Sequence, residues 1–399
     1  MNDAAAPRPI VMLEPGRHKR AAGGHPWIYS NELRMDRAAK ELPPGSLVAL
    51  EAADGRSLGA ATFNPHALIA ARLLDRDPRR PIDRRFFAAK LESALKLRQR
   101  LYPEPYYRLI HAEADGLPGV ILDRFGEVLA AQLNTAGMAR LEDEFIAACH
   151  ARLQPAAIVL RNDSPARALE GLPSEVRIAA GEIAGPVEIA ENGARFLVDP
   201  QHGQKTGWFY DQRENRRFVS RLCRGARVLD LYCFSGGFAI AAAVQGAAQV
   251  LGIDRSEPAL ALAEAAAGLN GVGESCRFAR GEAFAELARL AETGERFDVV
   301  IADPPAFVKS KKDLGPGLRG YRKLARLAAA RVAKGGLLFL ASCSHNVTPE
   351  AFAEAVRRGL EDAERGGRII LTSGAAPDHP VHPALPETAY LKAQVLALD

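Results

Sequence analysis

Residues 228–243 read VLDLYCFSGGFAIAAA. The pattern predicts an apolar strand that ends at Asp230, and then a turn at Ser235-Gly236-Gly237 that opens a helix. Glycines at such a turn let the backbone approach a ligand closely. A dinucleotide fold prefers G-x-G-x-x-G at this place, to seat a pyrophosphate at the helix N-terminus, and that spacing is absent. The turn therefore favours a ligand without phosphate, whose amino-acid end meets an acidic residue and backbone amides. An ordinary strand-to-helix turn is the alternative.

Strands alternate with helices around this turn. The predicted strand–helix pairs are Arg227–Leu231 with Gly237–Val244, Gln249–Asp254 with Pro258–Asn270, Phe297–Ala302 with Tyr321–Ala333, and Gly336–Ser342 with Pro349–Glu364. Two further strands, Arg368–Thr372 and Tyr390–Leu398, close the set. Alternating β and α elements predict a doubly wound, Rossmann-like α/β domain over residues 186–399, with ligands at the carboxyl ends of its parallel strands.

A second acidic residue, Asp254, ends the next predicted strand, within GIDRSEPALALAEAAAGLNG at 252–271. Nucleotide-binding α/β folds place an acid at this point to bind ribose hydroxyls, although Asp254 could instead cap the following helix. The first turn and Asp254 are more specific together, at this spacing, than either is alone. Glu282 follows a third short strand, where a carboxylate could reach an adenine amine.

The stretch FDVVIADPPAFVKSKKDL at 297–314 runs from an apolar strand into Asp303-Pro304-Pro305. Two prolines fix a rigid turn without backbone donors, so Asp303 projects at the strand end and can accept from the exocyclic amine or ring nitrogen of a base. A plain strand-ending turn is the alternative. Phe307 is either a base-stacking or a core residue, and the lysines after it contact phosphates or form an ordinary solvated loop. The candidate substrate contacts are Pro304, Pro305, Phe307, Lys309, Lys311 and Lys312.

The stretch LFLASCSHN at 338–346 places Cys343 at the end of the following parallel strand, on the same ligand-binding edge. Most cysteines are small buried hydrophobic residues, but the neighbours Ser342, Ser344 and His345 are polar. The 5 cysteines of the chain are scattered and include no C-x-x-C pair. This argues against a disulfide framework and against a zinc site, so no metal is expected.

The first half of the chain predicts two smaller domains. Short strands separated by Pro, Gly and Asp turns favour a compact β-barrel over residues 8–75. After a proline-bearing polar linker, residues 82–185 predict a central α+β domain in which we find no catalytic constellation. Residues 1–100 carry 18 Lys and Arg against 11 Asp and Glu, a surplus of 7 in a chain whose net charge is +4. This favours a module that docks on a polyanion, with an arginine-rich solvated face as the alternative.

The chain has no apolar run of membrane-spanning length, and its start, MNDAAAPRPIVML, does not resemble a signal peptide. We therefore expect a cytoplasmic protein that does not enter a membrane.

Several longer motifs carry a family resemblance. They are GRHKRAAGGHPWIYSNEL at 16–33, RLIHAEADGLPGVILDRFG at 108–126, QHGQKTGWFYDQRENRR at 201–217, DPPAF at 303–307, SCS at 342–344 and DHPVHPALPETAYLK at 378–392. The C-terminal half resembles the class I methyltransferases. Nearly the full length resembles the PUA-domain-containing large-subunit rRNA cytosine-C5 methyltransferases. The resemblance implies a PUA-like domain, a central domain and a methyltransferase domain, with S-adenosylmethionine as methyl donor and ribosomal RNA as partner; a homodimer stays open.

The resemblance also implies roles for individual residues. The turn at 230–237 would lie near the methionine part of the cofactor and Asp254 near its ribose, and part of the segment at 205–212 would contribute to cofactor or substrate binding. The candidate cofactor-binding residues are Lys205, Thr206, Phe209, Asp211, Gln212, Asp230, Tyr232, Phe234, Ser235, Gly236, Gly237, Asp254, Arg255, Glu282 and Asp303.

The implied chemistry explains why a cysteine is needed. Carbon 5 of cytosine is a weak nucleophile, and a thiolate that adds to carbon 6 makes carbon 5 enamine-like. Cys343 is the candidate thiolate, and Asp303 is its candidate partner at N3 or at the exocyclic amine. The target base must be exposed or flipped out of its stack. Some cytosine-C5 enzymes carry a second cysteine directly after the proline of this motif, but here Ala306 follows Pro305.

Two other functions stay open. Asp-Pro-Pro-Ala-Phe also resembles the motif of N-methyltransferases that act on a guanine or adenine amine, which need no cysteine. A non-catalytic RNA-binding protein with a vestigial methyltransferase fold is the second alternative. A dehydrogenase is a more distant possibility, because the dinucleotide glycine spacing is missing.

Overall fold

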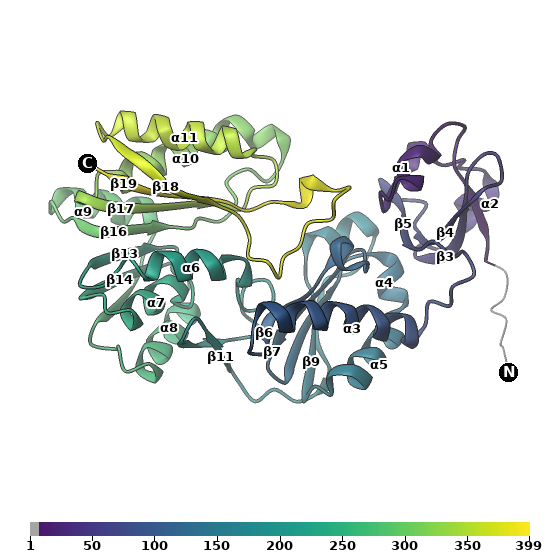
Figure 1. Cartoon of the computed structure of the whole chain (residues 1–399), viewed down its shortest axis with the longest axis horizontal. Helices are drawn as coiled ribbons and strands as arrows, with labels where there is room; N and C mark the ends of the chain where they lie inside the picture. The colour runs from purple at the N-terminus through teal and green to yellow at the C-terminus, as the bar shows by residue number, and fades with distance from the viewer. Residues whose placement is uncertain (1–7) are drawn as a thin grey trace. The chain divides into compact units, whose positions relative to one another are not determined.

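The computed structural model describes residues 8–399, and the chain folds into two compact units (Figure 1). The first unit contains residues 8–185 and two returning segments, 199–208 and 378–386. The second unit contains residues 186–198, 209–377 and 387–399. The predicted domain over residues 186–399 is therefore interrupted by two segments that pack with the first unit. Among residues 8–399, no helix combines the length and apolar character that crossing a membrane requires.

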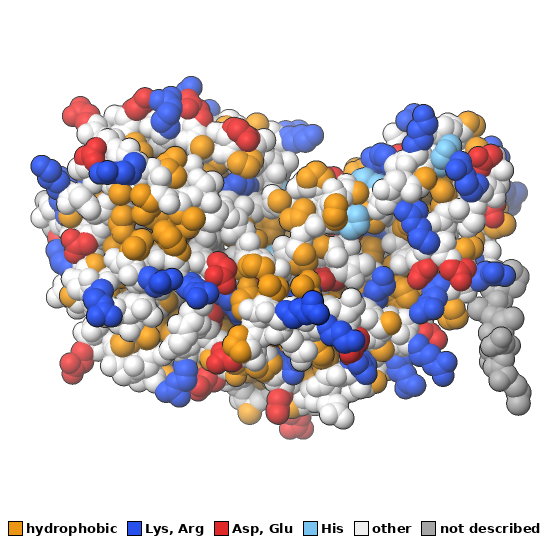
Figure 2. Space-filling view, viewed as in Figure 1, with side chains coloured by type: hydrophobic (Ala, Val, Ile, Leu, Met, Phe, Trp, Pro, Cys, Tyr) orange, Lys and Arg blue, Asp and Glu red, His pale blue; other side chains and the backbone are white. Residues whose placement is uncertain are grey.

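The N-terminal part of the first unit is a small five-stranded sheet, as the turn pattern predicts. The strand order is β1 (Ile10–Met12), β3 (Ser46–Glu51), β4 (Ser57–Phe63), β5 (Ile69–Asp75) and β2 (Trp27–Tyr29), with short helices α1 (His18–Ala22) and α2 (Arg37–Glu41). Alternate residues of β3, among them Val48 and Leu50, are buried in its core. Basic side chains are visible on this part of the surface (Figure 2), and Arg17, Lys19 and Arg37 are exposed.

The rest of the first unit is an α+β domain. Its sheet has the order β10 (Glu175–Gly181), β9 (Ala157–Asn162), β8 (Val128–Leu133), β7 (Val120–Phe125) and β6 (Tyr106–His111), with helices α3 (Arg84–Leu101), α4 (Ala136–Arg140) and α5 (Glu142–Leu153). Asp83 caps α3 by accepting from the Arg85 and Phe86 N–H groups. Strand β10, in which Val176 and Ile178 alternate with charged residues, is absent from the sequence-based prediction. It lies at the edge of its sheet and is mostly exposed.

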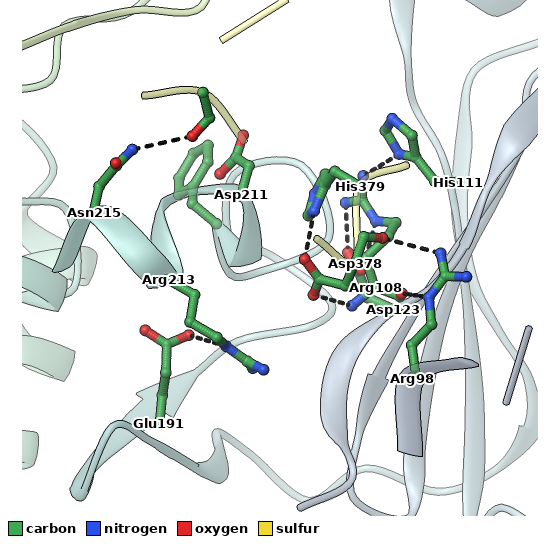
Figure 3. A network of polar contacts seen from close by, with 12 residues as sticks. Arg98, Arg108, His111, Asp123, Glu191, Asp211, Arg213, Asn215, Asp378 and His379 are labelled. Atoms are coloured by element: carbon green, nitrogen blue, oxygen red, sulfur yellow. Dashed lines mark hydrogen bonds and ion pairs between the residues drawn. The ribbon is translucent and has the colours of Figure 1, made fainter. Parts of the chain in front are cut away.

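Buried charged residues hold the returning segments in the first unit (Figure 3). The Asp378 carboxylate accepts from the Arg108 N–H at 3.0 Å, and the Asp378 carbonyl accepts from Arg98 at 3.0 Å. Arg108 also forms a two-pronged ion pair with Asp123, at 2.6 and 2.8 Å. The hydroxyl of Thr206 donates to the same Asp123 carboxylate. Paired and hydrogen-bonded charges of this kind are strongly destabilising to break, so they fix the path of both segments.

The second unit contains a seven-stranded sheet. Its order is β15 (Cys276–Arg280), β14 (Gln249–Asp254), β13 (Arg227–Leu231), β16 (Phe297–Ala302), β17 (Val332–Ser342), β19 (Lys392–Leu398) and β18 (Gly367–Ser373). The first five strands are parallel, and β19 is antiparallel to both of its neighbours. This confirms the doubly wound, Rossmann-like α/β fold.

Helices cover both faces of this sheet (Figure 1). They are α6 (Arg213–Ser220), α7 (Gly237–Val244), α8 (Glu257–Leu269), α9 (Ala283–Glu292), α10 (Leu314–Ala329) and α11 (Pro349–Asp362), and a hairpin of β11 (Val187–Glu191) and β12 (Ala194–Val198) precedes them. Alternate residues of β16 serve opposite faces: Val300 packs in the core that contains α10 and α11, and Val299 in the core that contains α7. Both faces being covered explains why the strands are continuously apolar.

One predicted helix is placed wrongly in the sequence. The expected span Tyr321–Ala333 is shifted, since α10 begins at Leu314 and ends at Ala329. A capping box between Ser310 and Asp313 starts a short helical turn that leads directly into α10. The apolar residues from Val332 onward then belong to strand β17, which extends further toward its N-terminus than predicted.

Candidate cofactor and active site

The turn between β13 and α7 has an unusual backbone. Tyr232, Phe234 and Gly236 adopt φ angles of +64°, +50° and +82°. Residues other than glycine rarely adopt positive φ, and such strain clusters at functional sites. A Cβ atom at Gly236 would lie 2.8 Å from the Ile240 side chain and 3.0 Å from that of Ala263. Glycine is thus required at this position, and the turn is fixed tightly at the carboxyl end of β13.

Negative charge is concentrated beside this turn. Asp230 is 1% exposed and accepts from the Ala239 N–H at 2.9 Å. Burial raises the pKa of Asp230 well above its usual range, and repulsion from Asp303 and Asp254 raises it further. Carboxylates that destabilise one another in this way favour a cationic ligand. The carboxyl ends of β13, β14 and β16 therefore suit an ammonium or a sulfonium group.

Asp254 stabilises the turn through the backbone. Its carboxylate accepts from the Phe234 N–H and from the Ser256 N–H, both at 2.9 Å. The N-cap of α8 is Ser256, so the expected alternative role of Asp254 as that cap is wrong. Beyond it, Arg255 and Glu282 form an exposed ion pair at 3.1 Å. These two residues thus lie near each other at the ends of β14 and β15.

A buried hydroxyl at the turn also points to a polar ligand. Ser235 is fully buried, and its Oγ has no hydrogen-bond partner among the residues that the structure describes. A buried polar group without a partner costs free energy, which a polar ligand at this turn could recover. Within residues 8–399, no group of three or more His, Cys, Asp or Glu side chains could hold a metal ion.

The two predicted catalytic segments meet at the neighbouring strand ends. Asp303-Pro304-Pro305 follows β16, and Cys343 follows β17 directly. The Cys343 thiol lies 4.0 Å from the Pro304 carbonyl oxygen. Asp303 and Cys343 are both half-buried, whereas Pro305 is exposed. The structure therefore brings a thiol and a carboxylate-bearing turn to one edge of the sheet, as parallel neighbouring strands require.

Tyr321 from α10 holds the segment that carries Cys343. Its hydroxyl lies 2.8 Å from the hydroxyls of both Ser342 and Ser344, the residues on either side of Cys343. Ser344 also accepts from the Val308 N–H at 3.2 Å. Burial raises the pKa of Tyr321, so this hydroxyl stays neutral near neutral pH. The cluster connects the loops after β16 and β17.

Phe307 is half-buried and packs against this support. Its ring centroid lies 4.7 Å from that of Tyr321 and 6.2 Å from that of Phe284. Phe307 thus contributes to the core. Part of its ring is still exposed, and stacking of that part on a base stays a prediction. The lysines that follow, Lys309, Lys311 and Lys312, are exposed.

The segment around residue 209 divides between the two units. Phe209 packs edge-on against Phe234, with centroids 5.3 Å apart, and Asp211 accepts from the Tyr390 hydroxyl. Gln212 accepts from Asn215 within the same unit. Lys205 and Thr206 instead belong to the first unit.

Comparisons with known proteins identify the family. Residues 97–373 match the model of S-adenosylmethionine-dependent methyltransferases, and residues 11–76 match a PUA-like domain. The chain belongs to the S-adenosylmethionine-dependent methyltransferases. Its cofactor is therefore S-adenosylmethionine, whose ammonium and sulfonium groups fit the acidic strand ends.

Curated relatives align with this methyltransferase over nearly the full length of both proteins. It is 35% identical over 390 residues to Ribosomal RNA large subunit methyltransferase I of Shewanella denitrificans, covering 96% of this chain and 98% of the relative. The protein of that name from Escherichia coli O157:H7 is 35% identical over 387 residues, covering 96% and 97%.

Solved structures support the fold of the methyltransferase. A putative SAM-dependent methyltransferase from Streptococcus mutans has a TM-score of 0.81 at 20% identity, covering 98% of this chain and all of that one. SMU.776, a putative methyltransferase complexed with SAH, has a TM-score of 0.82 at 20% identity, with the same coverage.

Two residues of the methyltransferase site are not predicted from the sequence. The sequence predicts only a helix at Tyr321 and no role for Lys392, which donates to the Ser344 carbonyl at 2.6 Å. Both lie on elements far from Cys343 in the chain. A lysine next to a mainly apolar run is the available signal for Lys392, because lysine is rarely buried without a partner.

Proposed function

We propose that this methyltransferase modifies carbon 5 of a cytidine in large-subunit ribosomal RNA. The relatives named for large-subunit ribosomal RNA support this choice of substrate. The observation that carries the chemistry is the contact between the Cys343 thiol and the turn that bears Asp303. A direct N-methyl transfer would give no role to a thiol at this place. The substrate would place the protein in the cytoplasm.

The proposed reaction uses Cys343 as a nucleophile. Its thiolate bonds to carbon 6 of the cytosine, and the electron pair of the 5,6 double bond moves toward N3. The Asp303 carboxyl group donates a proton to N3 as this charge develops, or orients the base by accepting from its exocyclic amine. The bound cofactor supplies an electrophilic methyl group for carbon 5. A base then removes the carbon-5 proton, the 5,6 double bond re-forms as the sulfur leaves carbon 6 as a thiolate, and N3 returns any proton that it took to Asp303.

Cys343 is the cysteine best suited to this step. Cys149 and Cys223 are fully buried, and Cys233 is nearly so. Burial raises the pKa of Cys276 to about 11, so it remains a thiol near neutral pH. Because Ala306 follows Pro305, the proposed enzyme forms and releases its adduct with one active-site cysteine.

We assign the cofactor to the strained turn and its acidic surroundings. Asp230 and the turn up to Gly237 would hold the methionine part, and Asp254 the ribose. Arg255 and Glu282 would lie toward the adenine. The same region would be supported by Phe209, Asp211 and Gln212. Two further candidates for cofactor or substrate binding, Lys205 and Thr206, belong to the first unit.

The PUA-like domain would dock the RNA. We place this domain at residues 8–75, the central domain at 82–185 and the methyltransferase domain at 186–399. Exposed Arg17, Lys19 and Arg37 would contact phosphates without reading sequence. Lys309, Lys311 and Lys312 would do the same beside the target base, and Pro304, Pro305 and Phe307 would line its pocket.

Replacing Gly236 with alanine should weaken cofactor binding at least about tenfold. The left-handed backbone costs an L-residue about 1–2 kcal/mol, and the new Cβ would also press on Ile240 and Ala263. Relief of that strain must distort the turn. Calorimetric titration with S-adenosylmethionine measures the change. Gly268→Ala is the matched control, because its Cβ meets no atom within 4 Å and should leave affinity unchanged. Equal affinities for the two variants would contradict the assignment of the cofactor to this turn.

The product of methyl transfer tests the proposed function. The purified protein should transfer labelled methyl from S-adenosylmethionine to protein-free 23S rRNA and much less to 16S rRNA. Mass spectrometry of the digested nucleosides should show 5-methylcytidine. A methylated guanosine or adenosine would replace the proposal with the N-methyltransferase alternative. If the protein binds the cofactor but transfers no methyl group to protein-free RNA, the result would favour a non-catalytic RNA-binding role.

A further inference from the structure

Lys392 is a buried lysine beside the proposed nucleophile. It is 6% exposed and begins β19, where it pairs with Ser342 of β17. Its ammonium donates to the Ser344 and Tyr390 carbonyls, both at 2.6 Å. On the β17 side, Lys392 pairs with Ser342, the residue before Cys343, and donates to the carbonyl of Ser344, the residue after Cys343. The lysine therefore fixes the segment that carries the thiol.

The charge of Lys392 interacts with that of Cys343. Burial lowers the pKa of Lys392 to about 8, and attraction to a Cys343 thiolate opposes this lowering. Near neutral pH the lysine is therefore mostly an ammonium. A thiolate next to a lysine is more easily formed than an isolated one.

Other titratable groups lie near the segment that carries the thiol, among them Asp303, Tyr321 and His345. Asp303, on the turn that Cys343 contacts, is acidic and would disfavour a thiolate. Tyr321 lies behind the segment and is neutral, since burial raises its pKa. His345 is exposed and packs on the Tyr390 ring, with centroids 5.1 Å apart. Lys392 is a buried cation that contacts this segment directly.

We propose that Lys392 is a positioning residue that keeps Cys343 as a thiolate, by anchoring the Ser344 carbonyl and placing its ammonium beside the sulfur. This inference rests on the proposed function of Cys343. The thiol proton goes to solvent before the thiolate adds to carbon 6. When the adduct breaks, the electron pair of the carbon–sulfur bond leaves with the sulfur, and the same ammonium stabilises it. The charge thus helps both steps in an enzyme with one active-site cysteine.

The pH dependence of alkylation tests the inference in the full-length protein. Iodoacetamide labelling of Cys343, followed by peptide mass spectrometry from pH 6 to 10, reports its thiolate fraction. In the native protein the apparent pKa of Cys343 should lie below the ordinary value of about 8.5. Lys392→Met should raise it by about one unit, which slows alkylation at pH 7 about tenfold. The difference should disappear near pH 10, where Lys392 has lost its charge and both thiols are ionised.

Matched variants separate charge from structure. Lys334→Met removes an exposed lysine near the other end of β17 and should leave the profile unchanged. Lys392→Arg keeps the positive charge and should keep the lower apparent pKa. Cys223 is fully buried, so its resistance to iodoacetamide shows in the same sample that the variant is folded.

Two results would overturn the inference. One is a folded Lys392→Met protein whose Cys343 profile matches the native protein. The other is an apparent pKa of Cys343 in the native protein that is at or above the ordinary thiol value. This second result overturns the inference even if the Lys392→Met variant fails to fold. The proposed function would fail by a different result, which is full methylation by Cys343→Ala. The two failures can be told apart because alkylation of Cys343 does not depend on turnover.

Discussion

Cys343→Ala should lower the rate of methyl transfer to rRNA by about 10⁴-fold or more, while cofactor affinity stays within about twofold. Without the thiolate, carbon 5 of cytosine keeps the weak nucleophilicity of an aromatic ring carbon. The alanine removes one atom from a half-buried position, so the Tyr321 cluster that supports the segment stays intact. Single-turnover transfer with saturating S-adenosylmethionine measures the rate, and calorimetry measures the affinity.

A mechanism-based substrate makes the same prediction visible as a covalent bond. RNA that contains 5-fluorocytidine carries fluorine where the proton must leave, so the adduct with Cys343 should persist. A denaturing gel should show the protein–RNA species for the native chain and not for Cys343→Ala. Cys276→Ala serves as the control and should form the adduct normally, since Cys276 lies on β15 at the far edge of the sheet. Full methylation by Cys343→Ala would remove the cytosine-C5 assignment.

Asp303→Asn should lower the saturated rate of methyl transfer by about 10²–10³-fold, the size of effect seen when one group that stabilises developing charge is lost. The asparagine has nearly the same shape, so the turn before Pro304 should keep its structure. Because the lost charge also repels Asp230, the pKa of Asp230 should fall toward its usual range. Single-turnover kinetics at saturating RNA and cofactor separate this effect on rate from an effect on binding.

Asp298→Asn is the control for this experiment. Asp298 lies on the same strand as the Asp303 turn but near its start, where its carboxylate accepts from the Arg227 N–H at 2.8 Å. Its replacement should change stability slightly and leave the saturated rate unchanged. An Asp303→Asn protein with a normal rate and a weakened cofactor affinity would assign Asp303 to the cofactor instead of the base.

The local parts of this site are predictable from the sequence. The turn at Ser235-Gly236-Gly237, the turn at Asp303 and the position of Cys343 each follow an apolar run directly, and parallel strands align their ends. The start of α10 was harder to predict, because a capping box between Ser310 and Asp313 begins the helix in a stretch whose lysines read as a loop.

The support for Cys343 could not be predicted, because it depends on long-range packing. Lys392 reaches the site only through the antiparallel pairing of β19 with β17, a strand order that skips β18. Tyr321 reaches it through the packing of α10 on the sheet. Likewise, no local pattern shows that Thr206 pairs with Asp123 in the first unit. Contacts of this kind depend on the tertiary fold and not on the periodicity of one element.

The bonds from Arg98 and Arg108 to Asp378 have a consequence for how the protein is made. A ribosome delivers the chain from its N-terminus, and domains generally fold as units while they emerge. The last piece of the first unit, residues 378–386, is synthesised only after nearly all of the second unit. The first unit must therefore remain incomplete while residues 209–377 of the second unit are synthesised. A nascent chain stalled before residue 378 should thus be more easily cut by proteases in its first half than the finished protein.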